Sequence, residues 1–181
     1  MWAFGRASGF IALALFTASV LLGILNRSGR PLLVLPRFSI SLLHRNIALL
    51  AAVFLGLHVG SLLLDSYAKL RPVDVLVPFL GSFRPFWQGL GTVTLDLVAA
   101  VLVTALLRRR VGQRVFKAVH WLSYGVWPVA MAHAIGNGTD VGSMLFFLLA
   151  AASALAVAGA VVWRLSATFL ETSKAREGNL L

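Results

Sequence analysis

Five long runs of apolar residues constrain the fold of this chain more than any other feature. A helix needs about 20 apolar residues to cross a hydrocarbon core about 30 Å thick, and each run is long enough. The runs cover residues 7–26, 38–64, 85–107, 118–139 and 141–163. Only 12% of the 181 residues are charged, against about 25% in soluble domains. The sequence therefore predicts an all-α fold, an integral membrane helical bundle of about five transmembrane helices.

The distribution of positive residues predicts how the chain is oriented. Lysine and arginine near the ends of spans are retained on the cytoplasmic side. One side of the membrane collects Arg6, Lys69, Arg71 and Arg84, and the other collects Arg27, Arg30, Arg37, Arg108, Arg109, Arg110, Arg114, Lys117, Arg164, Lys174 and Arg176. We expect the N-terminus outside and the C-terminus in the cytoplasm. The net charge of +10 then reflects topology, and no nucleic-acid partner is expected because no soluble domain offers a basic face.

Cysteine is absent from the chain, whereas histidine occurs four times. Without thiols the protein cannot hold an iron–sulfur cluster, attach haem covalently or carry out thiol redox chemistry. Each histidine falls in or at the end of a predicted span, at His44, His58, His120 and His133. Ionisable groups inside membrane helices are rare and usually functional. These four residues are therefore the candidate cofactor and metal ligands.

The spacing of the histidines predicts two sites at different depths. His44 and His58 have an i, i+14 spacing in the second span, and His120 and His133 have an i, i+13 spacing in the fourth. At 1.5 Å per residue these separations are about 21 and 20 Å. The second and fourth spans run in the same direction, so His44 is level with His120, and His58 with His133. Two flat sites flanked by imidazoles result, the arrangement needed for bis-histidine axial ligation of two stacked haems.

The directions of the side chains support the first pair more readily than the second. At 100° per residue, an i, i+14 spacing returns a side chain to within about 40° of its starting direction, whereas an i, i+13 spacing leaves it about 140° away. His120 and His133 can share one cleft only if their helix overwinds or bends, and Gly125 with Pro128 offers a place for this. The alternative is that Pro128 is an ordinary membrane-helix proline and one ligand assignment is wrong.

These motifs resemble the ferric-reductase-like transmembrane domain, which ferric reductases, NADPH oxidases and the membrane haem subunit of the bacterial methionine sulfoxide reductase system share. The histidine spacings carry the resemblance, and the i, i+13 spacing at 120–133 is that family's own pattern. Further similar segments are GLGTVTLDL (89–97), LRRRVG (107–112), HWLSY (120–124) and HAIGNGTD (133–140). The resemblance covers roughly residues 40–163.

The resemblance implies transmembrane electron transfer through two non-covalent haem b groups. His44 and His120 would hold the inner haem, and His58 and His133 the outer one. Electrons would pass from the cytoplasmic side towards an extracytoplasmic acceptor or partner reductase. The chain would then be the electron-transfer haem subunit of an oxidoreductase, in the inner (plasma) membrane of a bacterial cell.

Two further residues are candidates for contact with the haems. Arg45 adjoins His44 and would pair with a haem propionate, unless its side chain extends to the lipid headgroups instead. Trp121 would line the haem cleft, unless it serves as a packing or interface anchor. Asp96, inside the third span, is expected to be neutral or to form a hydrogen bond with a neighbouring backbone group, with Thr92 or with Thr94, or else to relay protons.

Two departures from the family pattern shape what we expect of the partners. Many relatives have six spans, whereas five are predicted here. Ferric reductases and NADPH oxidases usually continue into a cytoplasmic flavin and nicotinamide domain, but only about 18 residues follow the last span, without a Gly-rich dinucleotide motif. We therefore expect residues 1–181 to form a single transmembrane domain with no soluble flavin or nicotinamide domain. Its electrons would come from a separate donor protein, which could carry a flavin, or from quinol.

Other classes of function stay open at this point. The histidines could handle protons or metal ions in a membrane transporter or channel subunit. They could also form hydrogen bonds between helices in a structural subunit without a cofactor. A hydrolase is disfavoured, because no acid is positioned to orient a histidine beside a nucleophile. Catalytic zinc sites usually gather three protein ligands around one ion, which the wide histidine spacing opposes.

Overall fold

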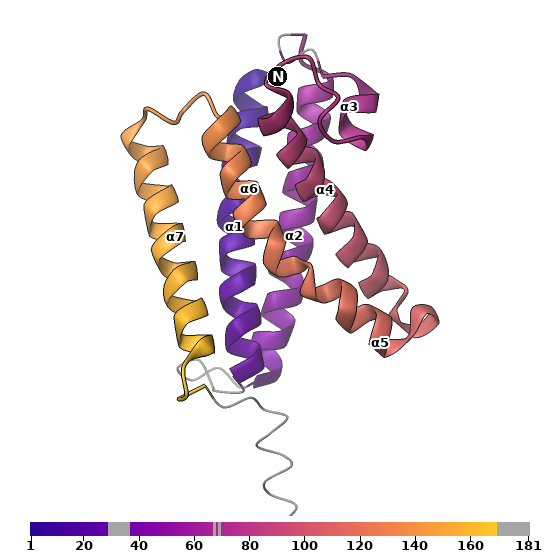
Figure 1. Ribbon diagram of the computed structural model, residues 1–181, viewed down its shortest axis with the longest axis vertical. Helices are drawn as coiled ribbons and strands as arrows, with labels where there is room; N and C mark the ends of the chain where they lie inside the picture. The colour runs from indigo at the N-terminus through magenta and orange to yellow at the C-terminus, as the bar shows by residue number, and fades with distance from the viewer. Residues whose placement is uncertain (29–36, 67, 69, 170–181) are drawn as a thin grey trace, which may run out of the picture.

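The computed structural model describes residues 1–28, 37–66, 68 and 70–169 (Figure 1). The helices are α1 (Trp2–Ser28), α2 (Arg37–Leu63), α3 (Pro72–Leu76), α4 (Pro85–Leu106), α5 (Arg108–Trp121), α6 (Ser123–Asn137) and α7 (Met144–Leu165). The described part contains no strand, which confirms the predicted all-α membrane bundle. Of the residues used for orientation, Arg30, Lys69, Lys174 and Arg176 lie outside the described part, as does the side chain of Arg37.

Four of the described helices, α1, α2, α4 and α7, are long and apolar enough to cross a membrane. They correspond to four of the five predicted runs. The fifth run, 118–139, is divided between the end of α5 and α6, because the helix breaks at Leu122. At the break, the Leu122 amide donates to the carbonyl of Val119 at 2.9 Å, and the Gly125 amide donates to that of Leu122 at 2.8 Å. Both are i to i−3 bonds, which tighten the chain locally.

The predicted bend between His120 and His133 therefore exists, but its position differs. We expected it between Gly125 and Pro128, whereas α6 begins at Ser123 and continues through Pro128. Figure 1 shows α5 and α6 meeting at an angle, with α6 continuing the path across the bundle. A second break lies in α5, where Gly112 has φ 81° and ψ 160°. Glycine tolerates this positive φ without the penalty that a side chain would bring.

The arrangement of the helices follows from which of them pack together. α1 and α2 lie side by side along most of their length, and α6 contacts both α1 and α4. α7 packs on α1 at the edge of the bundle (Figure 1). The N-terminus, α3 and the α6–α7 connection lie at one end, which we call the outer end. The α4–α5 connection lies at the opposite, inner end.

The buried core forms a mid-depth layer between α1, α2 and α6. Its members are Ala12, Phe16, Ala51, Leu55, Val126 and Ala130. Small residues let membrane helices approach closely, which strengthens their van der Waals packing in the absence of a hydrophobic driving force. Ala51 is fully buried at this contact. Many large apolar side chains instead face outwards, among them Leu155 at 75% exposure, as expected for helices surrounded by lipid.

Candidate functional site

The four histidines form two facing pairs, one on each side of the mid-depth layer. The ring centres of His44 and His120 are 6.3 Å apart, and their planes are inclined by 87°. Those of His58 and His133 are 6.5 Å apart and inclined by 80°. In each pair α2 supplies one ring, and α5 or α6 supplies the other. The structure thus brings together the same partners that the spacing predicted, at the inner and outer ends respectively.

The break at Leu122 explains how His120 and His133 serve the same side of the bundle. In one continuous helix their side chains would diverge by about 140°. Because His120 lies at the end of α5 and His133 in α6, the angle between the two helices changes this relation. On α2 no break is needed, since the i, i+14 spacing of its histidines is close to a whole number of helical turns.

Three of the four rings are oriented by hydrogen bonds to helix carbonyls. Nδ1 of His44 lies 3.0 Å from the Ser19 carbonyl oxygen, and Nδ1 of His58 lies 2.7 Å from that of Gly5. Nδ1 of His133 lies 2.8 Å from the carbonyl oxygen of Trp87. A carbonyl accepts only, so Nδ1 carries the proton and Nε2 presents its lone pair.

His120 differs from the other three rings. Its Nδ1 is buried and has no hydrogen-bond partner in the described part of the chain. The ring instead packs beside Phe116, with ring centres 5.3 Å apart. The inner pair is therefore held by one backbone hydrogen bond, and the outer pair by two.

Sequence reasoning missed three glycines that lie against the histidines. A Cβ atom at Gly9 would lie 2.9 Å from His58, one at Gly23 would lie 3.3 Å from His44, and one at Gly91 would lie 2.7 Å from His133. A signal for two of them was present in the chain. Gly9 and Gly23 have the same i, i+14 spacing as His44 and His58 on the neighbouring helix.

The other predicted site residues lie near the inner pair without a ring contact to it. Arg45 is exposed beside His44, and its side chain makes no polar contact with the described residues. Trp121 is 56% exposed and packs on Tyr124, with ring centres 5.3 Å apart. The Arg164 guanidinium of α7 lies over both rings, 5.2 Å from the centre of Trp121 and 4.8 Å from that of Tyr124.

Trp127 links α6 to α1 between the two histidine levels. Its Nε1 donates a hydrogen bond of 2.9 Å to the Thr17 hydroxyl. Thr17 lies between Gly9 and Gly23 in α1, and Trp127 lies between the two histidines of its own pair of helices. The indole N–H of this half-buried tryptophan is thereby satisfied beside the apolar layer.

Asp96 does not make the hydrogen bonds considered from the sequence. Thr92 donates to the Asp74 carbonyl at 2.8 Å, and Thr94 donates to the Leu90 carbonyl at 2.9 Å. The Asp96 side chain is exposed and has no polar partner in the described part. It lies about 140° around α4 from Gly91 and so points away from the outer histidine pair.

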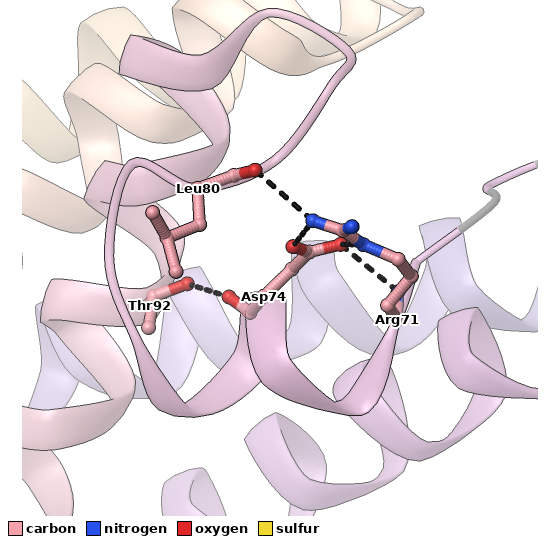
Figure 2. A network of polar contacts seen from close by, with 4 residues as sticks. All are labelled: Arg71, Asp74, Leu80 and Thr92. Atoms are coloured by element: carbon pink, nitrogen blue, oxygen red, sulfur yellow. Dashed lines mark hydrogen bonds and ion pairs between the residues drawn. The ribbon is translucent and has the colours of Figure 1, made fainter.

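Polar contacts fix the outer end of α4 next to the outer histidine pair. Asp74 is buried and accepts hydrogen bonds from the Arg71 amide, Nε and Nη2 at 3.0, 3.1 and 2.7 Å. Arg71 also donates to the Leu80 carbonyl at 3.1 Å, and Thr92 joins the same network (Figure 2). The Arg71 hydrogen bond holds the pKa of the Asp74 carboxyl below its usual range. This network ties α3 to the helix that carries Trp87 and Gly91.

Two more arginines hold the outer end of α6. Arg6 of α1 forms a two-pronged ion pair with Asp140, through Nε at 2.7 Å and through Nη2. Arg84 donates to the Gly136 carbonyl at 2.8 Å, although its own backbone has a positive φ of 43°. The outer end of α6 is thereby connected to α4, and the chain that follows it is connected to α1.

Comparison with known proteins identifies the family. Residues 8–131 match the family described as "Ferric reductase like transmembrane component", a match over more than half of the chain. No curated protein and no solved structure gives a significant match. The chain therefore belongs to the ferric reductase-like transmembrane family, which indicates a role in electron transfer across a membrane.

Proposed function

We propose that this chain carries electrons across a membrane through two stacked b-type haems, each ligated by two histidines. His44 and His120 hold the inner haem, and His58 and His133 hold the outer one. The observation that carries this proposal is the presence of two facing histidine pairs at two depths of one bundle.

The geometry of the pairs fits axial ligation. Metal–imidazole bonds of about 2 Å put the two ring centres about 6 to 6.5 Å apart when one ion lies between them. The observed separations of 6.3 and 6.5 Å match this. Near-perpendicular rings are also compatible with one macrocycle, because each ring can stand upright on its own face of it. No group of three or more His, Cys, Asp or Glu in the described residues could hold an ion alone, which favours pairs that complete a porphyrin.

The chain orients the histidine ligands and sets the dielectric around the sites, and the haem iron supplies the one-electron chemistry when bound. Carbonyl acceptors keep Nδ1 protonated on His44, His58 and His133, so that Nε2 is available as a ligand. The mid-depth layer separates the two levels with apolar side chains. Arg45, exposed beside His44, would offer a cation to a haem propionate, and Trp121, exposed next to His120, would border the inner site.

The direction of transfer and the partners belong to the same proposal. The described arginines of the inner end include Arg27 and Arg108–Arg110, so the positive-inside rule puts this end in the cytoplasm. Electrons enter at the inner pair from a protein donor, a flavoprotein among the candidates, or from quinol. They leave at the outer pair towards an extracytoplasmic acceptor or partner reductase. The chain is then a multi-pass protein of a bacterial plasma membrane, with its N-terminus outside.

Absorption spectroscopy tests the proposal. The purified protein should be red and, on reduction, show the sharp Soret and split visible bands of low-spin bis-histidine haem. Two haems per chain are expected from pyridine haemochrome quantification. A membrane transporter or channel that uses its histidines for protons or metal ions would give a colourless preparation instead.

Histidine variants assign the two sites. His58→Ala and His133→Ala should each remove the outer haem and spare the inner one, while His44→Ala and His120→Ala should do the reverse. Leu57→Ala, an exposed neighbour of His58, serves as the matched control and should retain both haems. Loss of both haems from every single histidine variant, with the control intact, would contradict two independent sites.

A further inference from the structure

We infer that Gly9, Gly23 and Gly91 are positioning residues for the histidine ligands. Each lacks a side chain where a histidine ring reaches past it to a helix carbonyl. Their role in positioning haem ligands rests on the proposed function. The histidine–carbonyl hydrogen bonds that the glycines permit can be measured independently of haem binding.

The same local arrangement occurs three times on two helices. The carbonyl that accepts from His58 belongs to Gly5, four residues before Gly9. The acceptor for His44 is Ser19, four residues before Gly23, and the acceptor for His133 is Trp87, four residues before Gly91. In every case, therefore, the glycine sits one helical turn after the acceptor.

The spacing of four residues has a direct physical reason. In an α-helix the carbonyl of residue i bonds to the amide of residue i+4, and the side chain at i+4 stands beside that oxygen. A carbonyl has two lone pairs, so it can accept a second hydrogen bond if a donor can reach it. Glycine at i+4 leaves the approach open, and any larger residue covers it.

The distances show that little room is left for a side chain. A Cβ at Gly91 would lie 2.7 Å from His133 Cε1, and one at Gly9 would lie 2.9 Å from His58 Nδ1. At Gly23 the nearest atom of His44 would be 3.3 Å away, so the crowding there is milder. We therefore expect the effect of alanine to decrease in the order Gly91, Gly9, Gly23.

The fourth histidine, His120, does not follow this pattern. In α1 the two glycines have an i, i+14 spacing, and the same step from Gly91 along α4 leads to Ala105. The remaining histidine, His120, is also the one whose Nδ1 has no partner in the described part. No described glycine has the His120 ring among its nearest neighbours, and His120 is the histidine without a carbonyl acceptor among the described residues.

These hydrogen bonds are more than packing, because a membrane interior offers no water to satisfy a ring N–H. Bonding of Nδ1–H to a carbonyl fixes the tautomer, directs Nε2 towards the partner histidine and raises the basicity of the ligand. A displaced ring would lose both its orientation and its proton acceptor. Each glycine thus acts on one histidine and on one level.

Nuclear magnetic resonance of protein labelled with ¹⁵N-histidine tests the inference directly. The chain has four histidines, so each ring can be assigned by its own substitution. In the reduced protein, where bis-histidine iron is diamagnetic, we expect hydrogen-bonded Nδ1–H signals from His44, His58 and His133 and none from His120. Gly91→Ala should remove or shift the His133 signal alone, Gly9→Ala that of His58, and Gly23→Ala that of His44.

Two glycines of α2 provide matched controls. A Cβ at Gly56 or Gly60 would meet nothing within 4 Å, and both residues lie about 200° around α2 from His58. Gly56→Ala and Gly60→Ala should leave all ring signals unchanged. If Gly91→Ala behaves as these controls do, the inference is wrong.

Haem content separates this inference from the proposed function. We expect Gly9→Ala and Gly91→Ala to weaken haem binding at the outer level by roughly 10- to 100-fold, and Gly23→Ala to act on the inner level only. The low-spin electron paramagnetic resonance signal of the affected level should also shift. If the wild-type protein binds no haem, the proposed function is wrong. The ring N–H signals would still show whether the glycines position the histidines.

Discussion

Asp96 is an ionisable residue of a membrane helix whose side chain has no polar partner among the described residues. It lies in the middle of α4, and its side chain is exposed. An acidic side chain at the centre of a membrane helix costs about 2.5 to 3.5 kcal/mol on insertion-based scales. The proton relay considered from the sequence would require neighbouring polar groups, which the described residues around Asp96 do not provide.

We expect Asp96→Leu to stabilise the isolated protein. The thermal midpoint in detergent or lipid should rise, because the substitution removes an unpaired acid from an apolar surface. Ala99→Leu, also exposed on α4, controls for the added apolar area and should have little effect. A lower midpoint for Asp96→Leu in native membranes would indicate that a partner helix pairs with the acid.

Asp74 gives the outer end a predictable dependence on pH. Its pKa in the folded state is lowered, chiefly by the hydrogen bond from Arg71. The carboxylate therefore adds stability above its unfolded pKa of about 3.9, and this contribution is lost as the pH falls through the lower folded value. Asp74→Asn should lower the thermal midpoint at pH 7, and the difference from the unaltered protein should shrink below about pH 4. A difference that stays constant down to pH 3 would rule out this carboxylate as its source.

At the scale of the helices, the break between α5 and α6 determines where His120 points. Pro128 contributes to it, because its ring cannot donate to the carbonyl of Tyr124 and crowds that group. This loosens the first turns of α6, next to Leu122. Of the two carbonyl–histidine contacts of the outer level, His133 to Trp87 lies beyond Pro128 and His58 to Gly5 joins α2 to α1, so neither contains the break.

Pro128→Ala should therefore weaken the inner haem site and spare the outer one. Alanine restores the missing amide donor and favours a continuous helix by about 3 kcal/mol, which would turn His120 away from His44. Redox titration of the two haems measures this, with Val129→Ala as the neighbouring control. Equal loss at both levels would indicate instead that α6 as a whole had moved.

The sequence predicted the pairing of the histidines better than the means by which they are held. The i, i+14 and i, i+13 spacings are enough to match His44 with His120 and His58 with His133, because helical rise is nearly constant. The bend was expected from Gly125 and Pro128, but Leu122 carries no local signal of a break. Gly9, Gly23 and Gly91 were missed because a glycine in a membrane helix indicates close approach without naming the neighbour. That neighbour becomes known only when the helices are paired.

For the molecule as a whole, α7 lies apart from the two histidine levels. It packs mainly on α1, with the Phe10 and Phe146 ring centres 5.9 Å apart. The family match, over residues 8–131, also ends before α7 begins. The four histidines lie on α2, α5 and α6, and their carbonyl partners lie on α1 and α4, so the candidate site is contained in α1 to α6.

Truncation after Gly142 should accordingly preserve both haems while lowering the thermal midpoint. The inner haem is the more sensitive reporter, because Arg164 of α7 lies over Trp121. Absorption spectra of the purified truncated protein provide the measurement. If the inner haem is lost while the outer haem stays, then α7 and Trp121 complete the inner site.

The mid-depth layer has a consequence for energy conversion. Its six side chains are alanine, phenylalanine, leucine and valine, and the Trp127–Thr17 hydrogen bond beside them is a single polar contact and not a chain that connects the two levels. If the chain carries electrons as proposed, an electron that crosses this layer moves without a compensating proton, and we expect the transfer to be electrogenic. A membrane voltage of 100 mV then changes the driving force by about 2.3 kcal/mol for a charge that crosses the full thickness. On the proposed function, we therefore expect the rate of reduction at the outer face to depend on the membrane voltage.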